Sequence, residues 1–224
     1  MNALLSKLGL FWRSWRAQHP QIKAYYSELA QLLPCKVIDV PLMAVDLEMT
    51  GLDANFDQIL SIGLVPIVRG QLQLANAQHQ LVSIDGSVGQ SAAIHGILDS
   101  QLDGALSPEK AMAWFLEQSR GHLLVAHHAP LDIAFLQQGI LGLLKEPINL
   151  LAIDTMAIEK RRLLRQHEVL KEGELRLGAC RSRYNLPVYT AHNALIDAIA
   201  CGELLTAQIA AMGEAHKITV AELF

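Results

Sequence analysis

The sequence predicts a mixed α/β fold, in which helices flank one β-sheet and a helical extension precedes the sheet. Three strand patterns follow one another closely after Pro41, and helix and strand patterns alternate from about residue 107 onward. A run of strands followed by such alternation is typical of a mixed sheet in a single domain. The chain has 224 residues, 51% hydrophobic and 18% charged, which suffices for one folded core. We therefore predict an N-terminal helical extension at residues 1–37 and one domain at residues 38–215.

The extension has the pattern of one or two amphipathic helices over residues 3–33, separated at His19-Pro20 and ended by Pro34. Amphipathic helices usually bury their apolar face, so we expect the extension to pack on the domain. The alternative is a docking helix for a protein partner or a membrane surface. The apolar residues available for docking are Leu10, Phe11, Trp12 and Trp15.

The chain shows no pattern for secretion or membrane insertion. A signal peptide needs an uninterrupted apolar stretch, whereas the N-terminus mixes apolar residues with Lys7, Arg13 and Arg16. No run of 18 or more apolar residues occurs, so we expect no membrane partner. The three cysteines are widely spaced and form no C-x-x-C pair, which disfavours a disulfide framework or a zinc site. These features favour a cytoplasmic protein.

The first part of the domain reads as three strands, at residues 42–48, 59–68 and 71–82. Arg69-Gly70 forms a short turn, and Leu72 and Leu74 alternate with glutamines as in a half-exposed strand. Strands joined by connections this short form an antiparallel meander.

The second part alternates helices with short strands. Ser107 and Pro108 are a good helix start, because serine caps an N-terminus and proline fits the first helical position. We expect helices at residues 108–120, 133–141, 155–171, 174–184 and 194–212, and strands at residues 122–126 and 149–153.

Two acidic residues stand where the first strand ends. Side chains two residues apart on a strand share a face, so Asp46 and Glu48 project together. Two such carboxylates repel unless one is protonated or a cation lies between them. Oxygen ligands of this kind suit Mg²⁺ or Mn²⁺. The alternative is a solvated strand end, and the pair alone does not decide between them.

A third acid, Asp132, lies near the start of a helix, after His127 and His128. The helix macrodipole alone explains an aspartate in a first turn, but it does not explain the two histidines.

His192 and Asp197 form another candidate pair. On one helix they would lie about 140° apart and would not share a site. Asn193, however, is a suitable N-cap for a helix that begins at Ala194. Asp197 then lies early in the helix, and His192 lies in the preceding loop, from which it could fold back over the same site. A loop histidine is more often an ordinary surface residue.

Taken in order, three segments resemble the motifs of the DEDDh exonucleases, the family of the proofreading epsilon subunit of bacterial replicative DNA polymerase, ribonuclease T and oligoribonuclease. They are D-L-E-M-T-G at 46–51, H-H-A-P-L-D at 127–132 and H-N-A-L-I-D at 192–197. I-H-G-I at 94–97 is similar to a segment of the epsilon-like branch, and D-T at 154–155 to another family segment. The departures are Met49, His128 and Leu131, where the family usually has Thr, Asn and Phe, and none removes an acid or the third-motif histidine.

The resemblance implies an RNase H-like fold and a 3′–5′ exonuclease that acts on 3′ ends of single-stranded DNA and releases nucleoside 5′-monophosphates. It also implies two divalent cations, Mg²⁺ or Mn²⁺, held by Asp46, Glu48, Asp132 and Asp197. His192 would be the general base, a role that suits a side chain with an ordinary pKa near 6.5.

The resemblance further implies substrate contacts. The segment formed by Met49, Thr50, Gly51 and Leu52 would meet the terminal nucleotide, with Leu52 wedged against a base. Gly51 permits a close approach, although a plain turn glycine explains it equally. His95 is either a substrate contact or a structural histidine.

Several alternatives stay open. The substrate could be RNA, as for ribonuclease T or oligoribonuclease, and the acidic site could be the remnant of a catalytic site in a binding module. The basic stretch at 160–171, with Arg181 and Arg183, could follow a phosphate backbone or form a solvated face. The oligomeric state is open too, a homodimer included.

Overall fold

The computed structural model describes residues 3–165, 168–214 and 216–224. Within these residues six strands form one mixed sheet, in the order β3-β2-β1-β5-β6, with β4 also paired to β2. β2 is antiparallel to β1, β3 and β4, whereas β5 is parallel to β1 and β6 is parallel to β5. The strands are β1 (Leu42–Met49), β2 (Ile59–Val68), β3 (Gln71–Leu72), β4 (Gln78–Leu81), β5 (Leu123–Ala126) and β6 (Ala152–Asp154).

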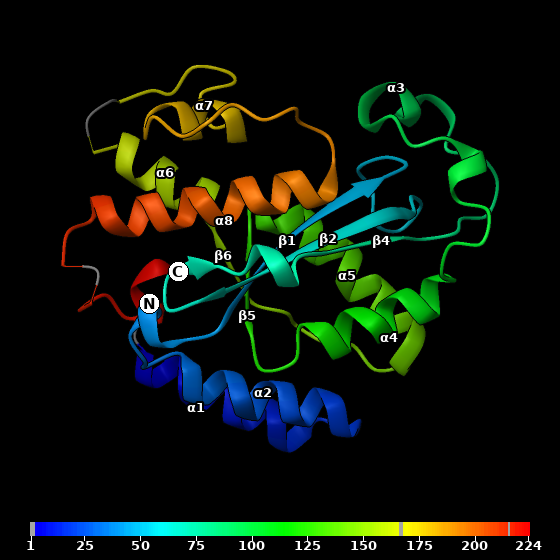
Figure 1. Cartoon of the computed structure of the whole chain (residues 1–224). Coiled ribbons are helices and arrows are strands. Elements are labelled where there is room, and N and C mark those ends of the chain that lie inside the picture. Colours follow the sequence, from blue (N-terminus) through cyan, green and yellow to red (C-terminus); the bar gives the residue numbers. More distant parts are fainter. Residues whose placement is uncertain (1–2, 166–167, 215) are drawn as a thin grey trace.

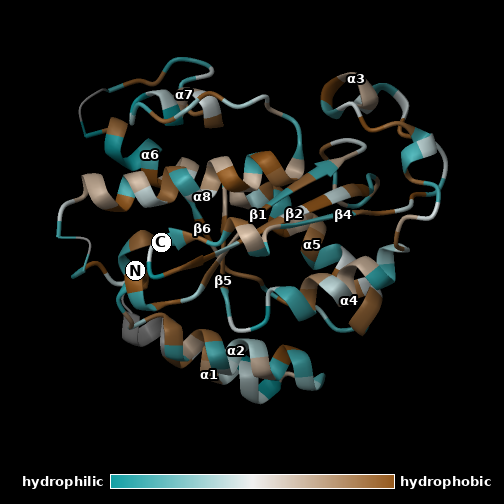
Figure 2. Cartoon of the chain, viewed as in Figure 1, coloured by the Kyte–Doolittle hydropathy of each residue, from teal (hydrophilic) through white to brown (hydrophobic). Residues whose placement is uncertain are grey.

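Helices surround this sheet, as predicted. α8 lies across one face of the sheet, and α1 and α2 lie along the lower edge of the molecule in the view of Figure 1. Hydrophobic residues dominate the central strands, and the loops around α6 and α7 are mostly hydrophilic (Figure 2). The α-helices are α1 (Ala3–Arg16), α2 (Pro20–Leu32), α3 (Ala92–His95), α4 (Pro108–Gln118), α5 (Ala129–Leu144), α6 (Thr155–Leu163), α7 (Leu177–Ser182) and α8 (Ala194–Ala211).

The third predicted strand is interrupted, which corrects the single strand expected at 71–82. A short 3₁₀ turn at Leu74–Asn76 separates β3 from β4. The cause lies in β2, where the carbonyl of Pro66 accepts a hydrogen bond from the Gln73 N–H. In an antiparallel ladder the N–H and the carbonyl of one residue point toward the same neighbouring strand. Pro66 offers its carbonyl to that strand, but it has no N–H to donate there. The ladder therefore breaks at Pro66.

α6 ends at Leu163, well before the predicted end near Lys171. Leu163 is buried, whereas Leu164 is 47% exposed. A helix in a protein is stabilised mainly by the packing of its apolar face, so the buried face that supports α6 ends at Leu163.

The N-terminal extension packs on the domain, as we expected. Leu10, Ile22 and Leu29 belong to the same hydrophobic core as the sheet. The hydroxyl of Tyr26 accepts a hydrogen bond from the Asn149 N–H at 2.7 Å. Beyond residue 215 the chain returns to this region, where the Val37 N–H donates to the Ile218 carbonyl. The boundaries of the extension and the domain stay a prediction.

α8 is long and apolar enough, by length and composition, to cross a membrane, but half of it is buried inside the fold. It packs on β1 and β2, so it is a core helix of this sheet. Its first turn approaches β2 at Gly63, where an added Cβ would overlap the backbone of Ala194 and Leu195. Gly63 is the cross-strand partner of Asp46. This glycine therefore lets the start of α8 come close to the end of β1.

Replacing Gly63 by alanine should push the start of α8 away from the sheet. Forced overpacking of this kind costs about 1–3 kcal/mol, measurable as a lower urea midpoint. Gly142→Ala is the control for an unobstructed glycine, because a Cβ at Gly142 meets nothing within 4 Å. It should keep or raise the midpoint, since alanine is favoured over glycine in helix α5. If Gly63→Ala unfolds at or above the wild-type midpoint, the close approach at Gly63 is not a constraint.

Candidate metal centre and active site

Three carboxylates meet at the end of β1. One oxygen from each of Asp46, Glu48 and Asp197 lies within 4.8 Å of the others. Asp46 and Glu48 share a face because they are two residues apart on β1. Asp197 reaches them from the first turn of α8, which Asn193 caps by accepting a hydrogen bond from the Ile196 N–H at 3.2 Å. This is the N-cap expected from the sequence.

Asp132 reaches the same region from the first turn of α5. The residue is 4% exposed; its charge acts on Asp46, and the charge of Glu48 acts on it. His128 precedes α5 in a left-handed conformation, with φ of 66°. The structure therefore brings Asp46, Glu48 and Asp197 together, and it places Asp132 close enough for its charge to act on Asp46.

The four acids are held together against their mutual repulsion. Burial, together with the charges of Asp132, Asp197 and Glu48, raises the pKa of Asp46 well above its ordinary value. Burial also raises the pKa of Asp132 to about 8, although the Leu47 N–H opposes this shift. For Glu48, burial and the charge of Asp197 raise the pKa to about 7.

These residues fit divalent cations. Clustered carboxylate oxygens are the ligands that Mg²⁺ and Mn²⁺ prefer. A bound cation would offset both the burial and the mutual repulsion that raise the pKa values. Ser61 adds a second observation, because it lies opposite Glu48 in the sheet and its buried hydroxyl has no hydrogen-bond partner among the described residues. Buried polar atoms of this kind call for an ion or an ordered water nearby.

His192 lies in the loop before α8, as predicted, and its side chain is exposed. Its backbone is left-handed, with φ of 68°, and its N–H donates to the Asp197 carboxylate at 2.6 Å. The same carboxylate that contributes to the acidic cluster thus fixes the backbone of the histidine. Burial, and to a lesser extent the charge of His192, lower the pKa of His95.

The other motif histidines are engaged in local structure. The ring of His95 accepts from the Ile97 N–H at 3.0 Å, and its other nitrogen contacts the Ser91 hydroxyl at 2.9 Å. The ring of His127 lies between the Thr155 hydroxyl and the Leu175 carbonyl, at 2.9 and 2.8 Å. A structural role explains these contacts, and substrate contact by His95 stays a prediction.

The loop after β1 contains the predicted substrate residues. The Thr50 hydroxyl donates to Asp57 at 3.2 Å and accepts from the Gln58 N–H at 3.0 Å, so it closes the loop. A Cβ on Gly51 would overlap the Asp57 carboxylate, so a larger residue there would displace the side chain that closes the loop. Met49 is half-buried, and Leu52 is 77% exposed beside the strand end.

Asp154 is a residue of this region to which the sequence analysis gave no role. One of its oxygens accepts from the His128 N–H at 3.1 Å and from the Met156 N–H at 2.9 Å. It thereby ties the start of α5, and so Asp132, to the start of α6. An aspartate at the end of a predicted strand and before a helix was the available signal.

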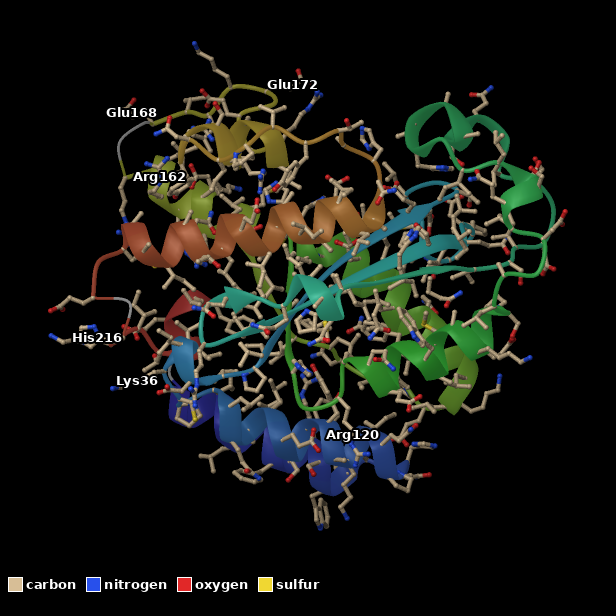
Figure 3. The ribbon with its side chains drawn as sticks, in the orientation of Figure 1. Lys36, Arg120, Arg162, Glu168, Glu172 and His216 are labelled. Carbon is tan, nitrogen blue, oxygen red and sulfur yellow. The ribbon has the colours of Figure 1, made fainter. Side chains whose placement is uncertain are left out.

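The basic residues do not form a phosphate track as a group. Arg181 is buried, which corrects its proposed exposure to a phosphate backbone. Arg183 lies 3.5 Å from the buried carboxylate of Glu159, and Arg162 pairs with the same residue. Arg162 belongs to the last turn of α6, and Glu172 lies on the loop above that helix in the view of Figure 3. Residues 166–167 of the basic stretch lie outside the described residues.

Comparison with known proteins decides the family. The model of the RNase_T family, described as exonuclease, matches residues 43–205. The chain belongs to this exonuclease family. The match confirms the resemblance drawn from the three motifs and, with it, the prediction of a 3′–5′ exonuclease enzyme.

Relatives of the chain include bacterial replication proteins. The chain is 30% identical over 172 residues to DNA polymerase III subunit epsilon of Treponema pallidum, with 76% of this chain and 77% of that protein covered. It is 30% identical over 161 residues to the PolC-type DNA polymerase III of Thermotoga maritima, covering 71% of this chain. The chain spans only 11% of the length of that PolC-type relative.

Solved structures confirm the RNase H-like fold. Exonuclease X in complex with 5′-overhanging duplex DNA has a TM-score of 0.59 and 23% identity, over 81% of this chain and 98% of that one. Cell-death related nuclease 4 has a TM-score of 0.64 and 16% identity, over 80% of this chain and 65% of that one.

The raised pKa values predict how stability depends on pH without divalent cations. Ordinary values are 4.5 for Glu48 and 3.8 for Asp132, so the unfolded chain loses these protons first as the pH rises. Between about pH 4 and 8 the folded state holds more protons, and its stability falls. We expect the metal-free chain to melt at a lower temperature at pH 8 than at pH 5, by about 2–4 °C per kcal/mol lost.

Saturating Mn²⁺ at pH 8 should restore the melting temperature, and Glu48→Gln should flatten its fall with pH. Glu172→Gln, at an exposed position, is the control that should leave the pH profile unchanged. A metal-free melting temperature that is constant or rises from pH 5 to 8 would contradict the repulsion described above.

Proposed function

We propose that the chain is a divalent-metal-dependent 3′–5′ exonuclease that hydrolyses phosphodiester bonds at the 3′ ends of single-stranded DNA and releases nucleoside 5′-monophosphates. The observation that carries this proposal is the convergence of Asp46, Glu48 and Asp197 within 4.8 Å, with His192 fixed to the last of them. Asp132 completes the acidic set from α5.

The proposed reaction is attack of water on the last phosphodiester. Asp46, Glu48, Asp132 and Asp197 would hold two divalent cations, Mg²⁺ or Mn²⁺. When bound, such ions stabilise the charge on the attacking and leaving oxygens of an in-line displacement. His192 accepts a proton from the attacking water, whose oxygen bonds to phosphorus. The bond from phosphorus to the 3′ oxygen breaks, and that oxygen keeps the electron pair and takes a proton.

The loop after β1 is the proposed contact for the terminal nucleotide. Leu52 is exposed beside the acidic cluster and could stack on a base, while Met49, Thr50 and Gly51 form the backbone beneath it. Removing apolar surface of this size from water contributes about 1.5–3 kcal/mol. His95, whose pKa is lowered by burial and by the charge of His192, is a second proposed contact.

The choice of DNA over RNA is supported by the names of the relatives. The Treponema relative is an epsilon subunit of DNA polymerase III, and exonuclease I of E. coli, with a TM-score of 0.64, was solved with a dT13 oligonucleotide. An RNA-directed enzyme is the alternative. Bacterial replication relatives also support a cytoplasmic location.

A protein partner at the extension is a further part of the proposal. Trp12 and Trp15 are 56% and 78% exposed on α1, in contrast to Leu10, which is buried in the core. An exposed aromatic pair of this kind suits a partner surface. A homodimer is one form that such a partner could take.

Product analysis tests the substrate and the polarity together. Single-stranded DNA and RNA of matched sequence, labelled at the 5′ end, should each be incubated with Mg²⁺ and with Mn²⁺. We expect a ladder of DNA shortened from the 3′ end, with nucleoside 5′-monophosphates as the product. Faster degradation of RNA would support the alternative substrate, and internal cleavage of either strand would contradict an exonuclease.

Variants of the site should separate its two roles. Asp46→Asn should abolish both Mn²⁺ binding, followed by isothermal titration, and hydrolysis. His192→Ala should leave Mn²⁺ affinity unchanged and lower kcat by about 10²–10⁴-fold, the usual contribution of a general base. Asp103→Asn, at an exposed loop position, is the control. Unchanged hydrolysis by the Asp46 variant would refute the mechanism, and wild-type protein that binds no Mn²⁺ would favour the binding-module alternative.

A further inference from the structure

The loop between α7 and α8 carries His192, yet most of it is exposed. Val188 is 96% exposed, and Thr190 and Ala191 are exposed as well. Two of its residues, Asn185 and His192, hold left-handed backbones with φ of 53° and 68°. Residues other than glycine adopt this conformation only at some cost, so contacts elsewhere must hold the loop in place.

The first anchor of the loop is a buried guanidinium. Arg181, at the end of α7, is 3% exposed. One of its nitrogens donates to the Ala200 carbonyl at 2.6 Å, in the middle of α8, and the other donates to the Pro187 carbonyl at 2.9 Å, in the loop. One side chain thus joins α7, α8 and the loop.

Two further side chains complete this anchor. Glu203 of α8 pairs with Arg181 at 2.7 Å and accepts the Tyr189 hydroxyl at 3.0 Å. The Arg181 guanidinium also lies over the Tyr189 ring, 4.6 Å from its centre. We call Arg181, Glu203 and Tyr189 the arginine clamp. A buried arginine that loses one such partner becomes an uncompensated charge. Loss of any one of the three side chains should therefore weaken the contacts of the other two.

The second anchor lies at the other end of the loop. The N–H groups of His192 and Asn193 donate to the Asp197 carboxylate, at 2.6 and 3.3 Å. Only Thr190 and Ala191 separate this anchor from Tyr189. Both anchors end on α8, since Asp197, Ala200 and Glu203 all belong to that helix. α8 therefore holds the backbone of His192 from both sides.

We infer that the arginine clamp positions His192 over the acidic cluster, and that Arg181, Glu203 and Tyr189 are positioning residues for hydrolysis. This inference rests on the proposed function of His192 as the general base. In the described part of the chain, the contacts of the clamp are with the Pro187 and Ala200 carbonyls and among its own three residues, and none involves the four acids. Its loss should therefore affect proton transfer without affecting the cation ligands.

Kinetics of three variants test the inference. Arg181→Met should lower kcat by about tenfold, and Tyr189→Phe and Glu203→Gln by about threefold or more, because small misplacement of a reacting group is costly. KM and Mn²⁺ affinity should stay within about twofold of wild type. Arg176→Met, at an exposed position in front of the same helix, is the matched control. If Arg181→Met does not fold, the kinetics of Tyr189→Phe provide the test instead.

A double-mutant cycle asks whether the clamp acts through His192. In a His192→Ala background the clamp substitutions should have almost no further effect on kcat, because the group they position is absent. An undiminished loss of rate in that background, or a loss of Mn²⁺ affinity in proportion to kcat, would overturn the inference. Either result would mean that the clamp supports the whole site through α8.

Hydrogen exchange of the metal-free full chain gives a readout independent of nuclease activity. In Tyr189→Phe and Glu203→Gln, the hydrogen-bonded loop amides of Leu186, His192 and Asn193 should exchange faster than in wild type, while those of residues 198–211 should not. Unchanged exchange in the loop would overturn the clamp as an anchor. If the wild-type chain hydrolyses neither DNA nor RNA, the proposed function fails, and the exchange result still decides whether the clamp holds the loop.

Discussion

The mutual repulsion of four acids at the end of β1 is the constraint on which the rest of the site depends. Asp46 and Glu48 come from one strand, Asp132 from α5 and Asp197 from α8. Buried carboxylates this close are unfavourable alone, so the surrounding core must hold them in place. The close approach of α8 to β2 at Gly63 is the part of the core that makes this possible. The fold therefore keeps negative charges close together, and bound divalent cations would reduce the repulsion between them.

The histidine side of the site depends on the same helix. Asp197 contributes an oxygen to the acidic cluster and also accepts the N–H of His192. A shift of α8 would therefore change the cation ligands and the general base together. The loop needs a separate anchor to orient the histidine without moving the helix, and the arginine clamp lies where that anchor is required. α8 thus positions the cation ligand Asp197 directly, and it positions the exposed loop that carries His192 through the arginine clamp.

Local sequence rules predicted much of this arrangement. The two-residue period of a strand placed Asp46 beside Glu48, and the capping preference of Asn193 placed His192 and Asp197 correctly. What the sequence could not show depends on contacts between distant segments. The break between β3 and β4 follows from the missing N–H of Pro66 on a neighbouring strand. Arg181 looked like a surface cation, because its partners on α8 and in the loop become neighbours only in the folded chain.

The most direct test of the central claim is a crystal structure of the wild-type chain with Mn²⁺, in which anomalous scattering locates the ions. We expect Mn²⁺ within bonding distance of Asp46, Glu48 and Asp197, with Asp132 completing the ligands of the site. Manganese bound elsewhere on the chain, or four acids that remain free of it when Mn²⁺ is saturating, would contradict the claim.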